Sequence, residues 1–112
     1  MPLRVAGSGH SQGPLASTPG GLLELDPRVE LEVDSSRCEA WIGAGAPLHD
    51  LEAPLRSHGL AFQNLGDVDV QTLAGAIATG THGTGRELGN LSSRVLGCLL
   101  YTSDAADDYF WV

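Results

Sequence analysis

Two glycine-rich segments carry the residues in this chain that are best suited to chemistry. The first is Gly7-Ser8-Gly9-His10-Ser11, where an imidazole and two hydroxyls stand on a backbone with little side-chain bulk. The second, residues 75–85, reads GAIATGTHGTG. Its small side chains leave backbone N–H groups open to an anion, and its threonines add uncharged hydroxyl donors. This second segment predicts a wall for a pyrophosphate-bearing ligand, because the apolar Ile77 and the alanines argue against a flexible linker.

The sequence excludes several other kinds of site. All six basic residues are arginines, so a Walker loop, which needs a lysine, is absent. The Gly clusters do not have the spacing of a dinucleotide-binding fingerprint, and no G-x-S-x-G elbow occurs. No carboxylate or histidine pair has metal-ligand spacing, so we expect no metal. The net charge of -8 argues against nucleic acid as a partner.

The histidines have a plain structural interpretation beside the functional one. An isolated histidine in a loop after a strand, such as His10, is often a hydrogen-bonded structural residue. The same holds for His82, and His49 and His58 receive no role. From the residue pattern alone, both interpretations of His10 stay open.

The cysteine usage and the apolar pattern indicate a cytoplasmic protein. Cys38 and Cys98 lie far apart and form no CxxC motif, which favours a reducing compartment. The first residues lack the basic and then apolar run of a signal peptide. No apolar stretch is long enough for a transmembrane segment.

The elements expected to position these residues alternate between strands and helices. Residues 3–6 and 22–25 predict short strands, the first of them buried. Residues 29–34 alternate between apolar and acidic side chains, and they pair with residues 38–42 across the turn 34–37. A helix is predicted from Pro47 to Gly59, with Leu48, Leu51 and Leu55 at helical spacing.

Further along the chain, residues 72–78 predict a second short helix, and residues 80–85 are too glycine-rich for a regular element. Pro54 lies inside the first helix, so its second half is expected to be irregular. This mixture of strands, helices and glycine loops indicates an α+β fold.

Three motifs, in this order along the chain, resemble the FAD-linked sugar-lactone and alditol oxidases. They are Arg4 to Ser11, Asn64-Leu65-Gly66-Asp67, and Gln71-Thr72-Leu73-Ala74-Gly75 through Gly85. The group includes L-gulonolactone and D-arabinono-1,4-lactone oxidases, and the resemblance covers residues 2–97. It implies a partial PCMH-type (vanillyl-alcohol-oxidase-like) FAD-binding domain.

The resemblance also implies a cofactor and a reaction. The His of the G-H-S motif, here His10, would be linked covalently to the flavin 8α-methyl carbon. The flavin would accept a hydride from a sugar lactone or alditol and pass the electrons to O2, giving hydrogen peroxide. No catalytic residue is assigned, because the family has its substrate pocket in a further domain. The cofactor-binding residues implied by the resemblance are Gly7, Ser8, Gly9, His10, Ser11, Thr72, Gly75, Thr79, Gly80, Thr81 and His82. Gln12-Gly13 departs from the family pattern, which has an aromatic residue or proline after the G-H-S serine.

The last residues are expected to be foreign to the gene. The resemblance stops at Cys98, and the run CLLYTSDAADD that begins there resembles a translated sequencing adaptor. We therefore divide the chain into a partial FAD-binding domain, residues 1–97, and a non-native tail, residues 98–112. A genuine acidic C-terminus is the alternative.

Three functional hypotheses follow. The first is an FAD-dependent oxidase acting on CH–OH donors, represented here by a fragment that is inactive alone. The second is a stand-alone small module that binds a phosphate-bearing ligand, or a non-functional truncated frame. The third is the FAD subunit of a molybdenum hydroxylase, which shares the fold but lacks the G-H-S linkage, so His10 favours the first.

Overall fold

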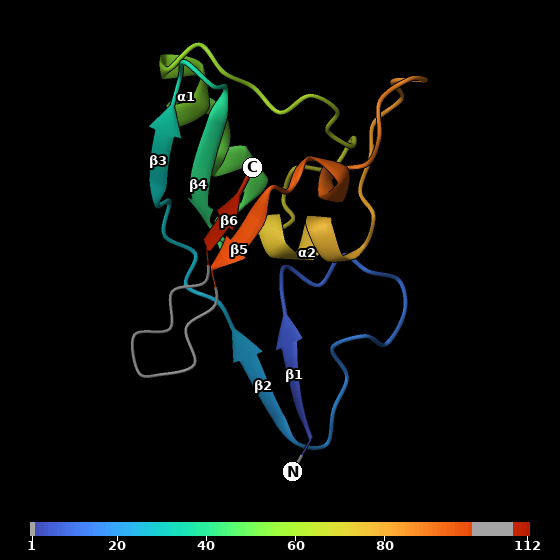
Figure 1. Ribbon diagram of the computed structural model, residues 1–112. Helices are drawn as coiled ribbons and strands as arrows, with labels where there is room; N and C mark the ends of the chain where they lie inside the picture. The colour runs from blue at the N-terminus through green and yellow to red at the C-terminus, as the bar shows by residue number, and fades with distance from the viewer. Residues whose placement is uncertain (1, 100–108) are drawn as a thin grey trace.

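The computed structural model describes residues 2–99 and 109–112. Within these residues the chain forms two sheets, two α-helices and one 3-10 helix. The first sheet consists of β1 (Leu3–Ala6) and β2 (Gly21–Glu24), which run parallel with Leu3 opposite Gly21. Figure 1 shows this two-stranded ribbon projecting away from the helices and the second sheet.

The second sheet has four strands in the order β3-β4-β6-β5, and all neighbours are antiparallel. Its strands are β3 (Leu31–Asp34), β4 (Glu39–Gly43), β5 (Gly97–Leu99) and β6 (Tyr109–Trp111). β3 and β4 form the hairpin that the alternating pattern predicts. The last strand, β6, lies between β4 and β5, so the end of the described chain joins two segments that are distant in sequence (Figure 1).

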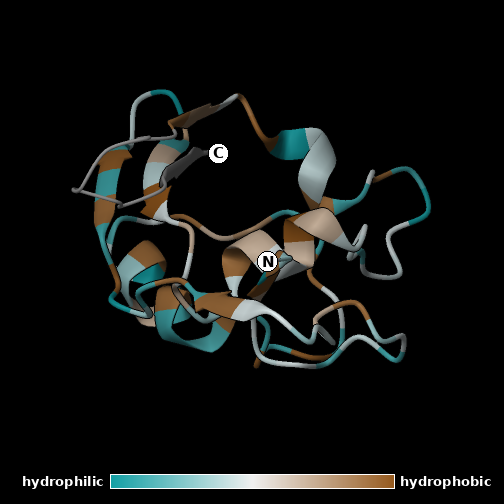
Figure 2. Cartoon of the chain, turned by 90° about the horizontal axis from the view of Figure 1, so that it is seen from below, coloured by the Kyte–Doolittle hydropathy of each residue, from teal (hydrophilic) through white to brown (hydrophobic). Residues whose placement is uncertain are grey.

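Two helices follow the hairpin. α1 (Leu48–Ser57) buries Leu48, Leu51 and Leu55, as their spacing predicts. Figure 2 shows α1 banded in hydrophilic and hydrophobic colours, whereas α2 (Leu73–Ala78) has no strongly hydrophilic band. The short 3-10 helix η1 (Leu91–Arg94) precedes β5.

The fold differs from the sequence prediction at Pro54. The predicted irregularity is wrong, because α1 continues through Pro54 to Ser57. Proline costs one backbone hydrogen bond inside a helix. Burial of Leu51 and Leu55, at 0% and 5% exposure, holds the turns on either side of it against the core.

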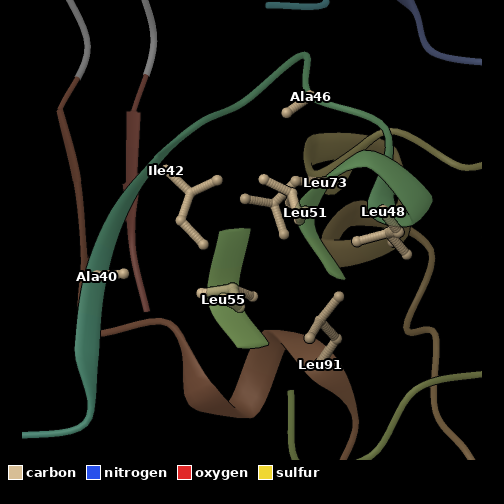
Figure 3. Packing of buried hydrophobic residues seen from close by; sticks show 9 residues of the cluster. Ala40, Ile42, Ala46, Leu48, Leu51, Leu55, Leu73 and Leu91 are labelled. Atoms are coloured by element: carbon tan, nitrogen blue, oxygen red, sulfur yellow. The ribbon is translucent and has the colours of Figure 1, made fainter. Parts of the chain in front are cut away.

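The core lies between the second sheet and the two helices (Figure 3). Its largest fully buried side chains are Ile42, Leu51 and Leu73, one each from β4, α1 and α2. Backbone hydrogen bonds join the same segments, since Leu73 N–H donates to the Ala46 carbonyl at 2.9 Å. α2 is therefore fixed to the chain that leads from β4 into α1.

The prediction that β1 is buried is wrong. Leu3 and Val5 are 66% and 57% exposed, and Leu22 on β2 is 51% exposed. A short apolar run is typical of a strand covered on both faces, whereas six of the eight residues of this ribbon are exposed. The sequence thus indicates the strand correctly and its surroundings incorrectly.

Cys38 lies in the turn between β3 and β4 and has a φ of +54°. The partner strand accordingly begins at Glu39, one residue after the predicted start.

A non-glycine residue in the left-handed region, such as Cys38, costs about 1–2 kcal/mol, and a glycine there costs about 0.5–1 kcal/mol because its unfolded state has more entropy to lose. We expect Cys38→Gly to raise the free energy of unfolding by about 0.5–1 kcal/mol, measured by urea denaturation. Cys38→Ala keeps a side chain at this φ, so its free energy of unfolding should not rise. An unchanged free energy of unfolding in Cys38→Gly would contradict the prediction.

The same turn is capped by Asp34. The Ser36 hydroxyl donates to the Asp34 carboxylate at 2.6 Å, and with backbone N–H donation from Arg37 and Ser36 it holds the pKa of Asp34 below its ordinary value. A depressed folded-state pKa contributes stability above the unfolded-state value, and this is lost as pH falls through the folded-state value. We expect Ser36→Ala to raise the pKa of Asp34, measured by carboxyl NMR titration. The free energy of unfolding of this variant should then fall less between neutral and acid pH than that of the original chain. An unchanged Asp34 titration in that variant would refute this cause.

Candidate functional site

The G-H-S segment and the start of the second glycine-rich segment face a shared cavity of about 390 Å³. This volume falls within the range of small-ligand sites. One wall is the loop from the end of β1 to residue 17, and the other is the segment 71–79, which includes α2. The predicted site residues on this cavity are Gly7, Ser8, Gly9, His10, Ser11, Thr72, Gly75 and Thr79. The structure therefore brings together two segments that are about 60 residues apart in sequence.

The loop after β1 offers unpaired backbone donors to this cavity. Among the described residues, no backbone N–H of residues 7–13 donates a hydrogen bond. Gly9 has a φ of +74°, a conformation that glycine adopts without steric cost. Successive free N–H groups in a glycine-rich loop form an anion-binding concavity. A loop of this kind can hold the phosphates of a dinucleotide without a lysine or arginine contact.

The second wall, segment 71–79, offers few free backbone N–H groups to a ligand. In the first turn of α2, Leu73 and Ala74 donate their N–H groups to the carbonyls of Ala46 and Ala44, both at 2.9 Å. Gly75 N–H donates to the Thr72 hydroxyl at 3.1 Å. The predicted open N–H groups therefore lie in the loop 7–13, and the start of α2 is already hydrogen-bonded.

Close contact between the two walls requires a glycine at position 7. A Cβ on Gly7 would lie 2.7 Å from the Thr72 hydroxyl oxygen, shorter than any real carbon contact of this kind. Ser8 joins the same walls, since its hydroxyl donates to the Val70 carbonyl at 2.5 Å. The sequence pattern did not indicate this contact.

The remaining predicted residues lie outside this cavity. Gly80 has a φ of +69°, the Thr81 hydroxyl donates to Gln71 at 3.4 Å, and His82 Nδ1 lies 2.8 Å from the Gly83 carbonyl oxygen. None of the three lines the cavity that His10 faces. Their role in cofactor binding stays a prediction.

The hydroxyls of the threonines are largely engaged within the protein. Thr79 donates to the Gly75 carbonyl at 2.9 Å, which closes the end of α2. Thr72 caps the start of the helix by accepting from Gly75. We expected the Thr79 hydroxyl as a ligand donor, and in the structure its proton is already donated within the protein.

Sequence reasoning missed some cavity-lining residues. Gln71 and Ala78 belong to the wall, as does the segment 13–17. Gln71 precedes the helix cap and Ala78 ends the helix, so the predicted helix could have indicated both. Residues 13–17 carry no pattern, and one contact that ties them to β1 is the hydrogen bond that the Arg4 guanidinium donates to the Leu15 carbonyl at 2.8 Å.

A second cavity of about 390 Å³ lies over β4 and η1. Arg37, Phe62, Leu91 and Arg94 are among its lining residues, and it includes none of the predicted site residues. It is therefore separate from the G-H-S loop.

In residues 2–99 and 109–112, no three His, Cys, Asp or Glu side chains are grouped to hold a metal. No helix in this part of the chain has the length and apolarity to cross a membrane.

Comparison with known proteins identifies the class that this fold and loop define. Residues 1–106 match the family of FAD binding domains. The chain belongs to this family, and FAD is its cofactor. Cholesterol oxidase from Brevibacterium sterolicum has a similar structure, with a TM-score of 0.68 at 20% identity, covering 98% of this chain and 24% of that one. This likeness confirms the predicted α+β, PCMH-type fold.

Several relatives are named as lactone oxidases or dehydrogenases. L-gulonolactone oxidase of Mus musculus is 38% identical over 104 residues, which is 91% of this chain and 23% of the relative. L-gulono-1,4-lactone dehydrogenase of Mycobacterium tuberculosis is 40% identical over 103 residues, which is 90% of this chain and 24% of the relative. D-arabinono-1,4-lactone oxidase of Yarrowia lipolytica is 35% identical over 99 residues, which is 84% of this chain and 19% of the relative. The chain thus spans about a fifth to a quarter of the length of these relatives. The predicted resemblance is confirmed.

The Gly7 contact predicts a defined effect on cofactor affinity. Gly7→Ala must displace the loop or Thr72, which separates the two walls, so we expect FAD to bind roughly tenfold more weakly, a loss of about 1.4 kcal/mol. Gly13→Ala in the same loop is the control, because its Cβ would lie at an ordinary 3.9 Å from Leu15. Flavin fluorescence titration measures both. Equal affinity for the two variants would show that the close approach does not shape the site.

Proposed function

We propose that this chain is the flavin-binding part of an oxidoreductase that oxidises a CH–OH group of a sugar lactone or an alditol. O2 is the proposed acceptor, and His10 is the proposed point of covalent attachment for FAD. The carrying observation is that the loop bearing His10 faces the same cavity as the segment 71–79, and that its backbone N–H groups donate no hydrogen bond within the described part of the chain. The names of the similar enzymes support the substrate class.

In this proposal the chain itself holds and orients the cofactor. The N–H groups of residues 7–13 bind the pyrophosphate, and Thr72, Gly75 and Thr79 form the facing wall. Residues 80–82 extend the binding surface beyond this cavity. FAD, once bound, supplies the hydride-accepting chemistry.

His10 is suited to covalent attachment by its position. It is exposed, lies on the cavity, and makes no hydrogen bond within the described residues, so its ring nitrogens are available. Attachment forms a bond between an imidazole nitrogen and the flavin 8α-methyl carbon. One hydrogen leaves the imidazole and one leaves the methyl group, and together they reduce O2 to hydrogen peroxide.

We also propose the domain division and the location. Residues 1–97 constitute the flavin-binding part, and residues 98–112 are a non-native tail. Two observations stand against this division, because the family match reaches residue 106 and β6 pairs with β4 and β5. Sequencing of the source transcript across codon 97 is therefore the decisive measurement: adaptor sequence after this codon would support the division, and genomic sequence would contradict it. A cytoplasmic location is supported by the free thiol of Cys38, which lies within the flavin-binding part.

A chimera tests the proposed function. Residues 2–97 replace the matching segment of mouse L-gulonolactone oxidase, which supplies the remaining three quarters of an enzyme. We expect bound FAD and hydrogen peroxide release with a gulonolactone or an alditol. A folded chimera without flavin would contradict the proposal. If the isolated chain then bound inorganic pyrophosphate, the small phosphate-binding module would be the better description.

A further inference from the structure

We infer that Ser8 is a positioning residue for the flavin site, acting through the loop that carries His10. Its hydroxyl anchors this loop to the segment that enters α2. The anchoring is a property of the described structure, whereas its consequence for the cofactor rests on the proposed function.

The anchor is one short hydrogen bond. Ser8 Oγ donates to the Val70 carbonyl at 2.5 Å across 62 positions of sequence. Among the described residues, it is the hydrogen bond that joins the loop 7–13 to the segment 69–79. The loop's own N–H groups have no partner in residues 2–99 or 109–112, so no described hydrogen bond from them fixes the shape of the loop.

The segment that receives this bond is held firmly on α1. The Asp69 carbonyl accepts from His49 N–H at 2.9 Å, and the Gln71 carbonyl accepts from Leu48 N–H at 2.9 Å. Val70 lies between these two anchored residues. Ser8 therefore connects the loop to the first turn of α1 and, through Leu48, to the core.

Ser11 provides a matched comparison within the same loop. It is also exposed and lines the same cavity, but its hydroxyl makes no hydrogen bond among the described residues. A loop whose N–H groups must point at an anion loses affinity when it samples other orientations. Removal of the Ser8 hydroxyl should have this effect. Removal of the Ser11 hydroxyl should leave the loop anchored, because it breaks no hydrogen bond among the described residues.

The test uses the 112-residue chain and its Ser8→Ala, Ser8→Thr and Ser57→Ala variants, with Ser11→Ala added for the hydrogen-exchange comparison. FAD is titrated by flavin fluorescence, and unfolding midpoints are recorded for each variant. We expect FAD to bind Ser8→Ala roughly three- to tenfold more weakly, the effect of one hydrogen bond. Ser8→Thr, which keeps a hydroxyl, should restore most of the affinity. Ser57→Ala removes a hydroxyl-to-carbonyl hydrogen bond at the end of α1, outside the cavity, and should bind FAD like the original chain. Each variant should still unfold cooperatively.

Amide hydrogen exchange without FAD gives a second measurement. We expect residues 7–13 to exchange faster in Ser8→Ala than in Ser11→Ala. Equal exchange in the two variants would overturn the anchoring. Unchanged FAD affinity in Ser8→Ala, or no rescue by Ser8→Thr, would overturn the positioning role. If the original chain bound no FAD, the proposed function and the positioning role would fail together, and the exchange data would still decide whether Ser8 anchors the loop.

Discussion

Replacement of His10 by alanine is expected to abolish the covalent attachment of flavin completely. The imidazole nitrogen is the atom that would form the bond, and alanine offers no substitute. His10 lies on the cavity with its ring unpaired among the described residues, so the substitution removes no contact that the fold needs. The variant should therefore fold normally, bind FAD reversibly, and lose it on denaturation.

The measurement is flavin fluorescence on a denaturing gel of the chimera described above. His82→Ala is the control, because His82 lies outside the cavity and its ring contacts the neighbouring Gly83 carbonyl. Fluorescence should stay with the protein in His82→Ala and vanish in His10→Ala. Fluorescent protein in His10→Ala would show that the flavin is attached elsewhere, and an unlabelled original chimera would show that the linkage does not form.

The largest expected effect on stability comes from Leu51. This side chain is 0% exposed and lies at the centre of the core, with Ile42 of β4 and Leu73 of α2 close by (Figure 3). Leu51→Ala leaves a cavity that the surrounding elements fill only in part, at a cost of about 2–5 kcal/mol. The loss should fall on α1 and α2 together, since both pack on this residue's cluster.

Urea denaturation followed by circular dichroism measures this change. Leu3→Ala is the matched control, because Leu3 is 66% exposed and its truncation should change the free energy of unfolding by less than about 0.5 kcal/mol. Similar losses in the two variants would show that the ribbon formed by β1 and β2 is covered in solution. A small loss in Leu51→Ala would contradict the core described here.

Much of the local structure could be predicted from the sequence. The alternation in residues 29–34 indicated β3, and the spacing of Leu48, Leu51 and Leu55 indicated α1. These predictions succeed because side-chain periodicity is set by the geometry of a strand or helix, which a few residues are enough to express. The FAD binding domain was likewise predicted from the motif order, and the family match confirms it.

The environment of each element could not be predicted in this way. The apolar run 3–6 reads as a buried strand, yet β1 is exposed because burial depends on which element covers it. The insertion of β6 between β4 and β5 depends on pairings that span most of the chain. No local pattern encodes such pairings, since they are selected by the summed contacts of the whole fold.

The same distinction between local pattern and tertiary structure applies to the candidate site. The sequence by itself determined the chemistry available: a histidine among glycines and serines, and a glycine- and threonine-rich wall without any lysine. Only the tertiary structure decided that loop 7–13 meets the segment 71–79, that Gly7 must be small against Thr72, and that Ser8 reaches Val70. It also placed residues 80–82 outside that cavity. The reason is that residue type and spacing fix which groups a segment offers, whereas the cavity arises from contacts between segments about 60 residues apart.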